Sequence, residues 1–118
     1  MKPIFDLTYL REVSKGNDAF MLDMIDIFLT KTPETLQILQ DAIISSNWEM
    51  VGFYAHKLKA TYAYMGMLDL KEELIKIEKS AKNMEELDLI PSIFNHLNEQ
   101  TNPALMEISE YKKSIVSN

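Results

Sequence analysis

One histidine in this chain has neighbours that suit nucleophilic chemistry. His56 lies in the run 55–60, Ala-His-Lys-Leu-Lys-Ala. If this run is helical, the residues that share a face with His56 are Gly52, Lys59, Ala60 and Ala63. Three of these four have almost no side chain, so another protein could approach the ring closely. A neutral imidazole carries a lone pair on one ring nitrogen, and the lysine supplies a cation one turn away.

The surrounding apolar residues predict the helix that positions this histidine. They step by three and four and predict an amphipathic helix over 47–66 with the stripe turned inward: Trp48, Val51, Ala55, Leu58, Tyr62 and Met65. His56 then lies at the edge of the stripe, on the solvent side. Gly52 costs about 1 kcal/mol relative to alanine inside a helix, so it calls for a packing or access reason. Without a longer motif, an ordinary surface histidine with solvated lysines is the simpler interpretation.

A longer match changes that balance. His56-Lys57-Leu58-Lys59, followed by Ala63 and Gly66, closely resembles the signature of histidine-containing phosphotransfer (HPt) domains, approximately Ala-His-x-Leu-Lys-Gly-Ser-x-Ala-x-x-Gly. Upstream, 28–36 and 39–48 resemble the family's second helix and its approach to the histidine helix. The resemblance covers about residues 5–82. One departure is Ala60, where the family usually has glycine, and its methyl group lies on the expected docking face.

The resemblance implies a phosphorelay intermediate. HPt domains receive a phosphoryl group from an aspartyl phosphate on a receiver domain and pass it to another receiver, which makes His56 the expected acceptor. Lys59 would bind the phosphoryl oxygens, and Lys57 would add positive potential although it points about 100° away. The receiver would cover Gly52, Ala60 and Ala63. Expected partners are receiver domains of response regulators, including one on a hybrid histidine kinase. The receiver supplies magnesium, so no metal or other cofactor is expected.

The chain lacks the motifs of a kinase. It has no Gly-rich phosphate loop and no Gly-x-x-x-x-Gly-Lys, so we expect a relay protein without autonomous kinase activity. Whether it acts as an enzyme stays open. The alternative is a non-catalytic helical interaction module that docks a receiver or another signalling partner without phosphotransfer. A degenerate domain of that kind would usually lack the histidine or its lysine, and this chain keeps His56 and Lys59.

A partner for the ring follows from helix register. If the helices on either side of the turn at 66–69 are antiparallel, facing residue numbers sum to about 135, which places His56 near Glu78 and Lys79. Glu78 could then accept a hydrogen bond from the ring and fix its tautomer, with plain solvation as the alternative. Di-iron and haem centres are excluded, since the chain has no Glu-x-x-His pair and no cysteine. We interpret His96 as structural or solvated.

Composition limits the remaining classes. The chain has 118 residues, of which 47% are hydrophobic and 25% charged, and we expect one domain over 1–118. A net charge of −6 disfavours nucleic-acid binding. The absence of cysteine excludes disulfides and thiolate sites. No basic and apolar leader or membrane-length apolar run occurs, so we expect a cytoplasmic monomer without membrane association.

The helical patterns along the chain predict an all-α fold, an antiparallel four-helix bundle with a short extra N-terminal helix. Only three glycines and four prolines interrupt the chain, and no segment alternates as strands do. The expected helices span 6–14 (capped by Asp6 and closed at Gly16), 18–46, 47–66 (capped by Asn47), 69–82 (with Asp69 and Glu72 as a capping box) and about 86–115. Pro33 should kink or break the second helix. Pro103 should kink the last one, with a break over 99–103 as the alternative.

Overall fold

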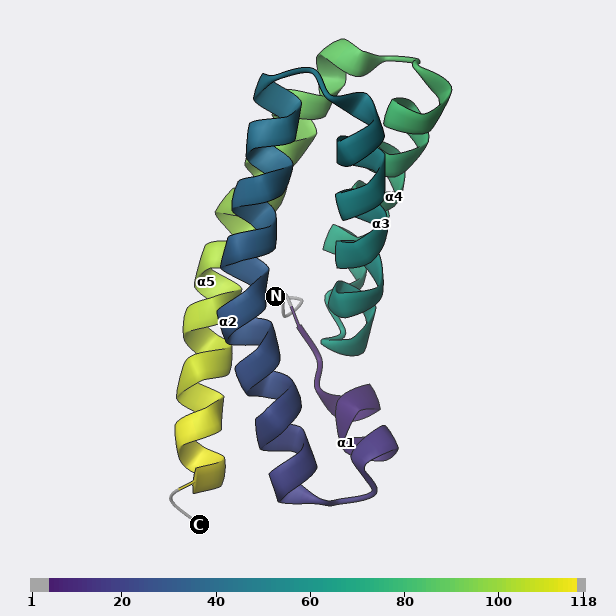
Figure 1. Cartoon of the computed structure of the whole chain (residues 1–118). Helices are drawn as coiled ribbons and strands as arrows, with labels where there is room; N and C mark the ends of the chain where they lie inside the picture. The colour runs from purple at the N-terminus through teal and green to yellow at the C-terminus, as the bar shows by residue number, and fades with distance from the viewer. Residues whose placement is uncertain (1–4, 117–118) are drawn as a thin grey trace.

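The computed structural model describes residues 5–116, and every regular element in that range is helical. The elements are α1 (Thr8–Ser14), α2 (Asp18–Ile44), α3 (Trp48–Tyr64), α4 (Leu68–Asn83), the 3-10 turn η1 (Leu87–Leu89) and α5 (Ile90–Val116). Helix α3 packs against α4 and α2, and α5 packs against α2 and α4. These four helices form the expected antiparallel bundle. Figure 1 shows α2 and α5 extending past the shorter α3–α4 hairpin, with α1 beside α2 below it.

The apolar stripes predicted from the sequence form the core. On α3, Val51, Ala55 and Tyr62 are fully buried and Leu58 is 2% exposed, as is Met65, which follows the helix. The other helices contribute in the same way, through Ile25, Phe28, Leu39, Leu74, Ile77, Leu97 and Ile108. Trp48 is the exception on the α3 stripe, because it is only partly buried. Burial of the stripe fixes the rotation of α3 and so decides which of its residues face solvent.

Neither internal proline breaks its helix. Helix α2 runs unbroken through Pro33, and α5 runs unbroken through Pro103, so the alternative of a break is wrong for both helices. Both prolines are exposed. Their neighbours are held in the core, with Thr32 1% and Leu36 5% exposed on α2, and Thr101 and Ala104 fully buried on α5. Core packing on both sides of each proline compensates for the missing backbone hydrogen bond.

The helix starts confirm one predicted cap and correct two. The Asn47 side chain accepts a hydrogen bond from the Met50 backbone N–H at 3.3 Å, at the start of α3. Asp6 also accepts one from the Thr8 N–H at 2.9 Å, but α1 begins at Thr8 and its cap position is Leu7, which makes no side-chain cap, so the predicted cap at Asp6 is wrong. The capping box at Asp69 is wrong, since α4 begins at Leu68 and its cap position is Met67, which makes no side-chain cap. Met67 is fully buried, and this core contact places the cap two residues before Asp69.

The turn after α3 holds the N-terminal segment. Gly66 has φ +66°, a left-handed conformation that favours glycine. The Asp6 N–H donates to the carbonyl of Met65 at 3.2 Å. A Cβ at Gly66 would lie 2.0 Å from the Asp6 carbonyl oxygen. Glycine is therefore required here twice, for the turn itself and for the close approach of the N-terminal segment.

Candidate functional site

His56 lies in the middle of α3 with its ring in solvent. Its neighbour Ala55 and the next stripe residue Leu58 are buried at 0% and 2% exposure. Because these residues face the core, the His56 side chain is left 67% exposed. A large molecule can therefore reach the ring without moving any helix.

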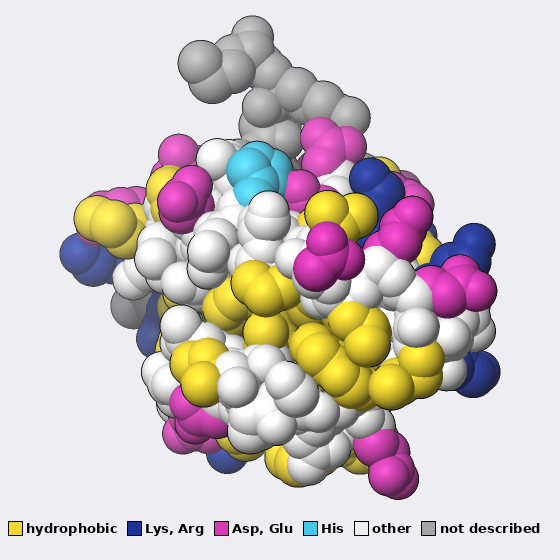
Figure 2. Space-filling model, turned by 90° about the horizontal axis from the view of Figure 1, so that it is seen from above, with side chains coloured by type: hydrophobic (Ala, Val, Ile, Leu, Met, Phe, Trp, Pro, Cys, Tyr) yellow, Lys and Arg dark blue, Asp and Glu magenta, His cyan; other side chains and the backbone are white. Residues whose placement is uncertain are grey.

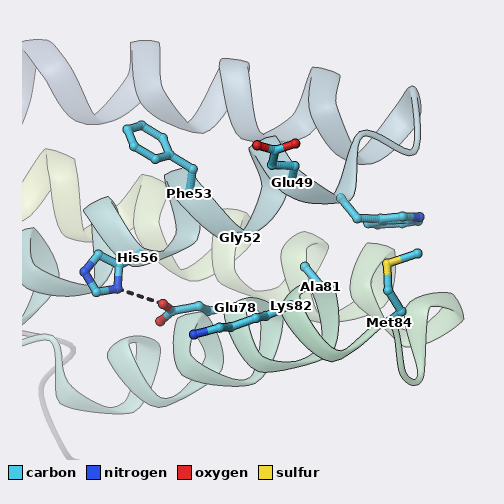
Figure 3. Close-up of a pocket in the computed structure, with 9 residues that line it drawn as sticks. Glu49, Gly52, Phe53, His56, Glu78, Ala81, Lys82 and Met84 are labelled. Atoms are coloured by element: carbon cyan, nitrogen blue, oxygen red, sulfur yellow. Dashed lines mark hydrogen bonds and ion pairs between the residues drawn. The ribbon is translucent and has the colours of Figure 1, made fainter.

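Glu78 of α4 binds one nitrogen of that ring. Its Oε2 lies 2.7 Å from His56 Nδ1, the pairing expected from the antiparallel register of α3 and α4 (Figure 3). Glu78 follows Ile77, which is fully buried and fixes the rotation of α4. A carboxylate only accepts hydrogen bonds, so with neutral imidazole Nδ1 carries the proton and donates it. The lone pair then lies on Nε2, on the opposite side of the ring.

Lys59 binds the same carboxylate. Its Nζ donates to Glu78 Oε1 at 2.9 Å, and its side chain is 29% exposed. Partial burial raises the pKa of Glu78, but hydrogen bonds and charge from Lys59 and His56 outweigh it, so the pKa lies below its ordinary value of 4.5. Glu78 is thus an anion at neutral pH that links the imidazole to a lysine.

Lys57 is placed differently from Lys59. Its Nζ lies 5.9 Å from the centroids of both the Phe53 and the Tyr54 rings. Cation–π contacts of this kind hold an ammonium group near aromatic faces. The two lysines beside His56 therefore point to different surroundings, as their positions on the helix predict.

The small residues of the expected docking face line two different hollows. Gly52 lies with His56 and Glu78 in a groove between α3 and α4. Ala60 and Ala63 line a second hollow, which Tyr9 of α1 and other residues complete. Their spacing on the helix predicted a single docking face. The structure places them on both sides of His56 along α3.

The α3–α4 groove contains residues that the sequence analysis missed. Its volume is about 490 Å³, and its lining adds Trp48, Glu49, Phe53, Ala81, Lys82 and Met84 to the expected residues (Figure 3). The spacing of Glu49, Gly52, Phe53 and His56 on one helical face was available as a signal. The α4 side was available from the same register that paired His56 with Glu78, since 52 and 81 also sum to about 135.

The second histidine forms a similar pair without the same neighbours. His96 Nδ1 hydrogen-bonds to Glu73 Oε1, which joins α5 to α4. The residue three positions after His96 is Glu99, where His56 has Lys59. A carboxylate there would repel an incoming phosphoryl group.

Within residues 5–116 no group of three potential ligands could hold a metal ion, and none of the helices has the length and apolar character of a membrane span.

Comparisons with known proteins agree with this geometry. The chain is 24% identical over 110 residues to the phosphorelay intermediate protein rdeA of Dictyostelium discoideum, which covers 93% of this chain and 43% of that protein. The chain thus spans less than half the length of this relative. The fold of the present chain is similar to that of histidine-containing phosphotransfer protein B (HptB) from Pseudomonas aeruginosa PAO1. The TM-score is 0.87 at 18% identity, and the match covers 97% of this chain and 98% of HptB. The family model of the Hpt domain matches residues 23–105, which include His56, Lys59 and Glu78, and the chain therefore belongs to the Hpt domain family.

Proposed function

We propose that this chain is a phosphorelay intermediate of two-component signalling, in which His56 accepts a phosphoryl group from a receiver-domain aspartyl phosphate and passes it to another receiver. The observation that carries the proposal is the exposed ring of His56 with Nδ1 held 2.7 Å from Glu78. This contact directs the lone pair of Nε2 away from the protein. Membership of the Hpt domain family supports the same reaction.

The transfer step follows from this tautomer. The Nε2 lone pair attacks phosphorus, the N–P bond forms, and the bond from phosphorus to the aspartate oxygen breaks. The aspartate leaves as a carboxylate with that electron pair. The ring keeps its Nδ1 proton and carries positive charge as the bond forms, and the Glu78 carboxylate stabilises it. The reverse step delivers the group to the next receiver.

Lys59 has a second proposed role at the phosphoryl group. Its ammonium lies one turn from His56 and carries three hydrogen-bond donors, one of which is used by Glu78 at 2.9 Å. The remaining donors can bind phosphoryl oxygens, whose negative charge spreads during transfer. Lys57 contributes positive potential at longer range.

The partners follow from the same proposal. A receiver would bind over His56 and reach Gly52 on one side and Ala60 and Ala63 on the other. We propose a hybrid histidine kinase as one source of the donor receiver, a cytoplasmic location, and a monomer. The helices complete their apolar core within one chain, which supports the monomer.

Phosphorylation of variants tests the function. The parent protein is incubated with phosphorylated receivers of the source genome, and the product is tested for an acid-labile, base-stable phosphate. His56→Gln should fold as the parent does and take up no phosphate. His96→Gln is the matched control and should label fully. Stoichiometric labelling of His56→Gln would overturn the assignment, and binding without any transfer to the parent would favour a pure interaction module.

A further inference from the structure

The groove beside His56 has the form of a slot for an apolar side chain. We call it the α3–α4 slot and define it by Trp48 and Phe53 of α3, Met84 at the end of α4, and the small residues Gly52 and Ala81. Figure 3 shows Gly52 and Ala81 between His56 at one end and Met84 at the other. Phe53 is 61% and Met84 61% exposed. Apolar surface of this size left open beside a reactive group is typical of a binding site.

Beyond Trp48 and Met84 of the slot, apolar side chains also lie on the end of the bundle (Figure 2). Figure 2 shows apolar side chains gathered over the end where α2 turns into α3 and α4 turns toward α5. Exposed apolar residues in these two connections include Ile44 at 75% and Leu89 at 47% exposure. The charged residues that line the slot are Glu49 and Glu78 on one hand and Lys82 on the other. No excess of positive charge is present there to select an anion, so the slot is suited to an apolar group.

The position of His56 decides which molecule covers the slot. His56 and Glu78 are themselves part of its lining. A receiver that brings its aspartyl phosphate within bonding distance of Nε2 must cover the adjoining surface, since a standard interface buries about 800 Å² on each partner. The occupant is therefore continuous with the proposed transfer interface. This argument rests on the proposed function.

We infer that the α3–α4 slot receives an apolar side chain from the docking face of the receiver, and that it thereby determines which receivers exchange phosphate with His56. Gly52 keeps the slot open. A Cβ at Gly52 would lie 3.9 Å from the Ala81 Cβ, an ordinary contact, so packing of α3 on α4 does not itself require glycine there. A glycine that lowers helix stability without being required by packing has another role, and an open slot supplies one.

The decisive variant fills the slot without disturbing the core. Gly52→Leu places a side chain among Phe53, Ala81 and Met84 and replaces glycine by a better helix former. Its melting temperature should equal or exceed that of the parent. Transfer from the receiver that reacts fastest with the parent should fall by about 10-fold or more, mainly through KM, because one well-filled apolar pocket contributes about 1.4 kcal/mol or more. Asn102→Leu, which places the same leucine side chain at an exposed position of α5, should transfer at the parent rate.

Two further measurements separate the slot from the histidine. Phosphoramidate, a small phosphoryl donor, reports the reactivity of His56 without a receiver, and Gly52→Leu should still be labelled by it. Trp48 is the only tryptophan of the chain, so its fluorescence reports occupancy of the slot. Addition of a tryptophan-free receiver should shift the emission of the parent to shorter wavelength and leave that of Gly52→Leu unchanged.

The outcomes distinguish this inference from the function it rests on. Parent-rate transfer to Gly52→Leu, or receiver binding that leaves Trp48 emission unchanged, would overturn the slot while leaving the relay function in place. Quenching of Trp48 by self-association at high concentration, with no receiver effect, would assign the slot to a second copy instead. Failure of every receiver of the source genome to phosphorylate the parent would overturn the function and the slot together.

Discussion

Glu78 uses both carboxylate oxygens at once, one for His56 at 2.7 Å and one for Lys59 at 2.9 Å. The carboxylate therefore sets the tautomer of His56, the proposed nucleophile, and the position of the Lys59 ammonium group. Because both bind Glu78, a substitution at His56 or at Lys59 alters the surroundings of the other residue. The effects of the two substitutions on the transfer rate are therefore expected not to add in the double variant.

Lys59 should matter more for transfer than Lys57. Lys59→Ala removes a donor for the phosphoryl oxygens and leaves Glu78 with one partner. Loss of a charge-assisted hydrogen bond of about 1.5 to 3 kcal/mol predicts transfer slower by roughly 10- to 100-fold. Lys57→Ala removes a cation held near Phe53 and Tyr54 and should change the rate by about twofold at most. Rapid-quench transfer rates measure both, and equal effects would contradict the assignment.

The lowered pKa of Glu78 predicts a pH-dependent contribution to stability. A carboxyl whose pKa is lower when folded binds fewer protons in the folded state, so its stabilisation is complete above the ordinary value of 4.5 and is lost as pH falls through the folded pKa. The difference in unfolding free energy between the parent and Glu78→Gln should be largest near neutral pH and should decrease as the pH falls below 4.5. Urea unfolding at several pH values measures it. A difference independent of pH would show that packing, rather than charge, holds Glu78.

At the scale of elements, the turn that follows α3 fixes the end of the histidine helix. Gly66 and Gly16 both have positive φ, at +66° and +77°, but only Gly66 has backbone atoms where a Cβ would lie. Gly16→Ala should cost about 1 kcal/mol, for the left-handed conformation alone. Gly66→Ala should cost about 3 kcal/mol, since the N-terminal segment must also move. Chemical denaturation of the two variants tests this, and similar losses would mean that the contact with Asp6 adds little.

Periodicity predicted the elements well because the core stripes of α2 to α5 are regular. Register then predicted that His56 faces Glu78, since antiparallel neighbours keep a constant sum of residue numbers. Such reasoning could not predict that α2 continues through Pro33, because this depends on the burial of Thr32 and Leu36. It also could not predict that Asp69 is not the cap of α4, because the start of that helix depends on the burial of Met67. The α3–α4 slot was not predicted because it is the space between two helices. The residue pattern along one helix describes only the side chains of that helix.

At the scale of the whole molecule, one buried hydrogen bond ties the histidine helix to the last helix. Tyr62 is fully buried, and its hydroxyl lies 2.8 Å from Thr101 Oγ1, which itself donates to the Leu97 carbonyl at 2.7 Å. Tyr62 is therefore the donor of the pair. Burial raises the pKa of Tyr62, so the phenol stays neutral and keeps its proton to donate.

The two partners should differ in what their loss costs. Tyr62→Phe removes the donor and leaves Thr101 bonded to Leu97, which predicts a loss of about 1 kcal/mol. Thr101→Val leaves the Tyr62 hydroxyl buried without an acceptor, and predicts a loss of about 1 to 3 kcal/mol. Both variants should relay phosphate at the parent rate, because the bond lies in the core. Thermal unfolding and transfer assays on the same samples test this, and a slower relay in either would connect the core to the chemistry.

The 67% exposure of the His56 side chain would also limit the lifetime of a phosphoryl group bound to its ring. A ring that any receiver can reach is equally open to water, and water hydrolyses a phosphorus–nitrogen bond formed at such a ring. Among residues 5–116 no lid lies over the ring, so a bound partner would shield the proposed phosphohistidine from water. The fraction of the phosphoryl group lost to hydrolysis would then depend on how soon the next receiver binds.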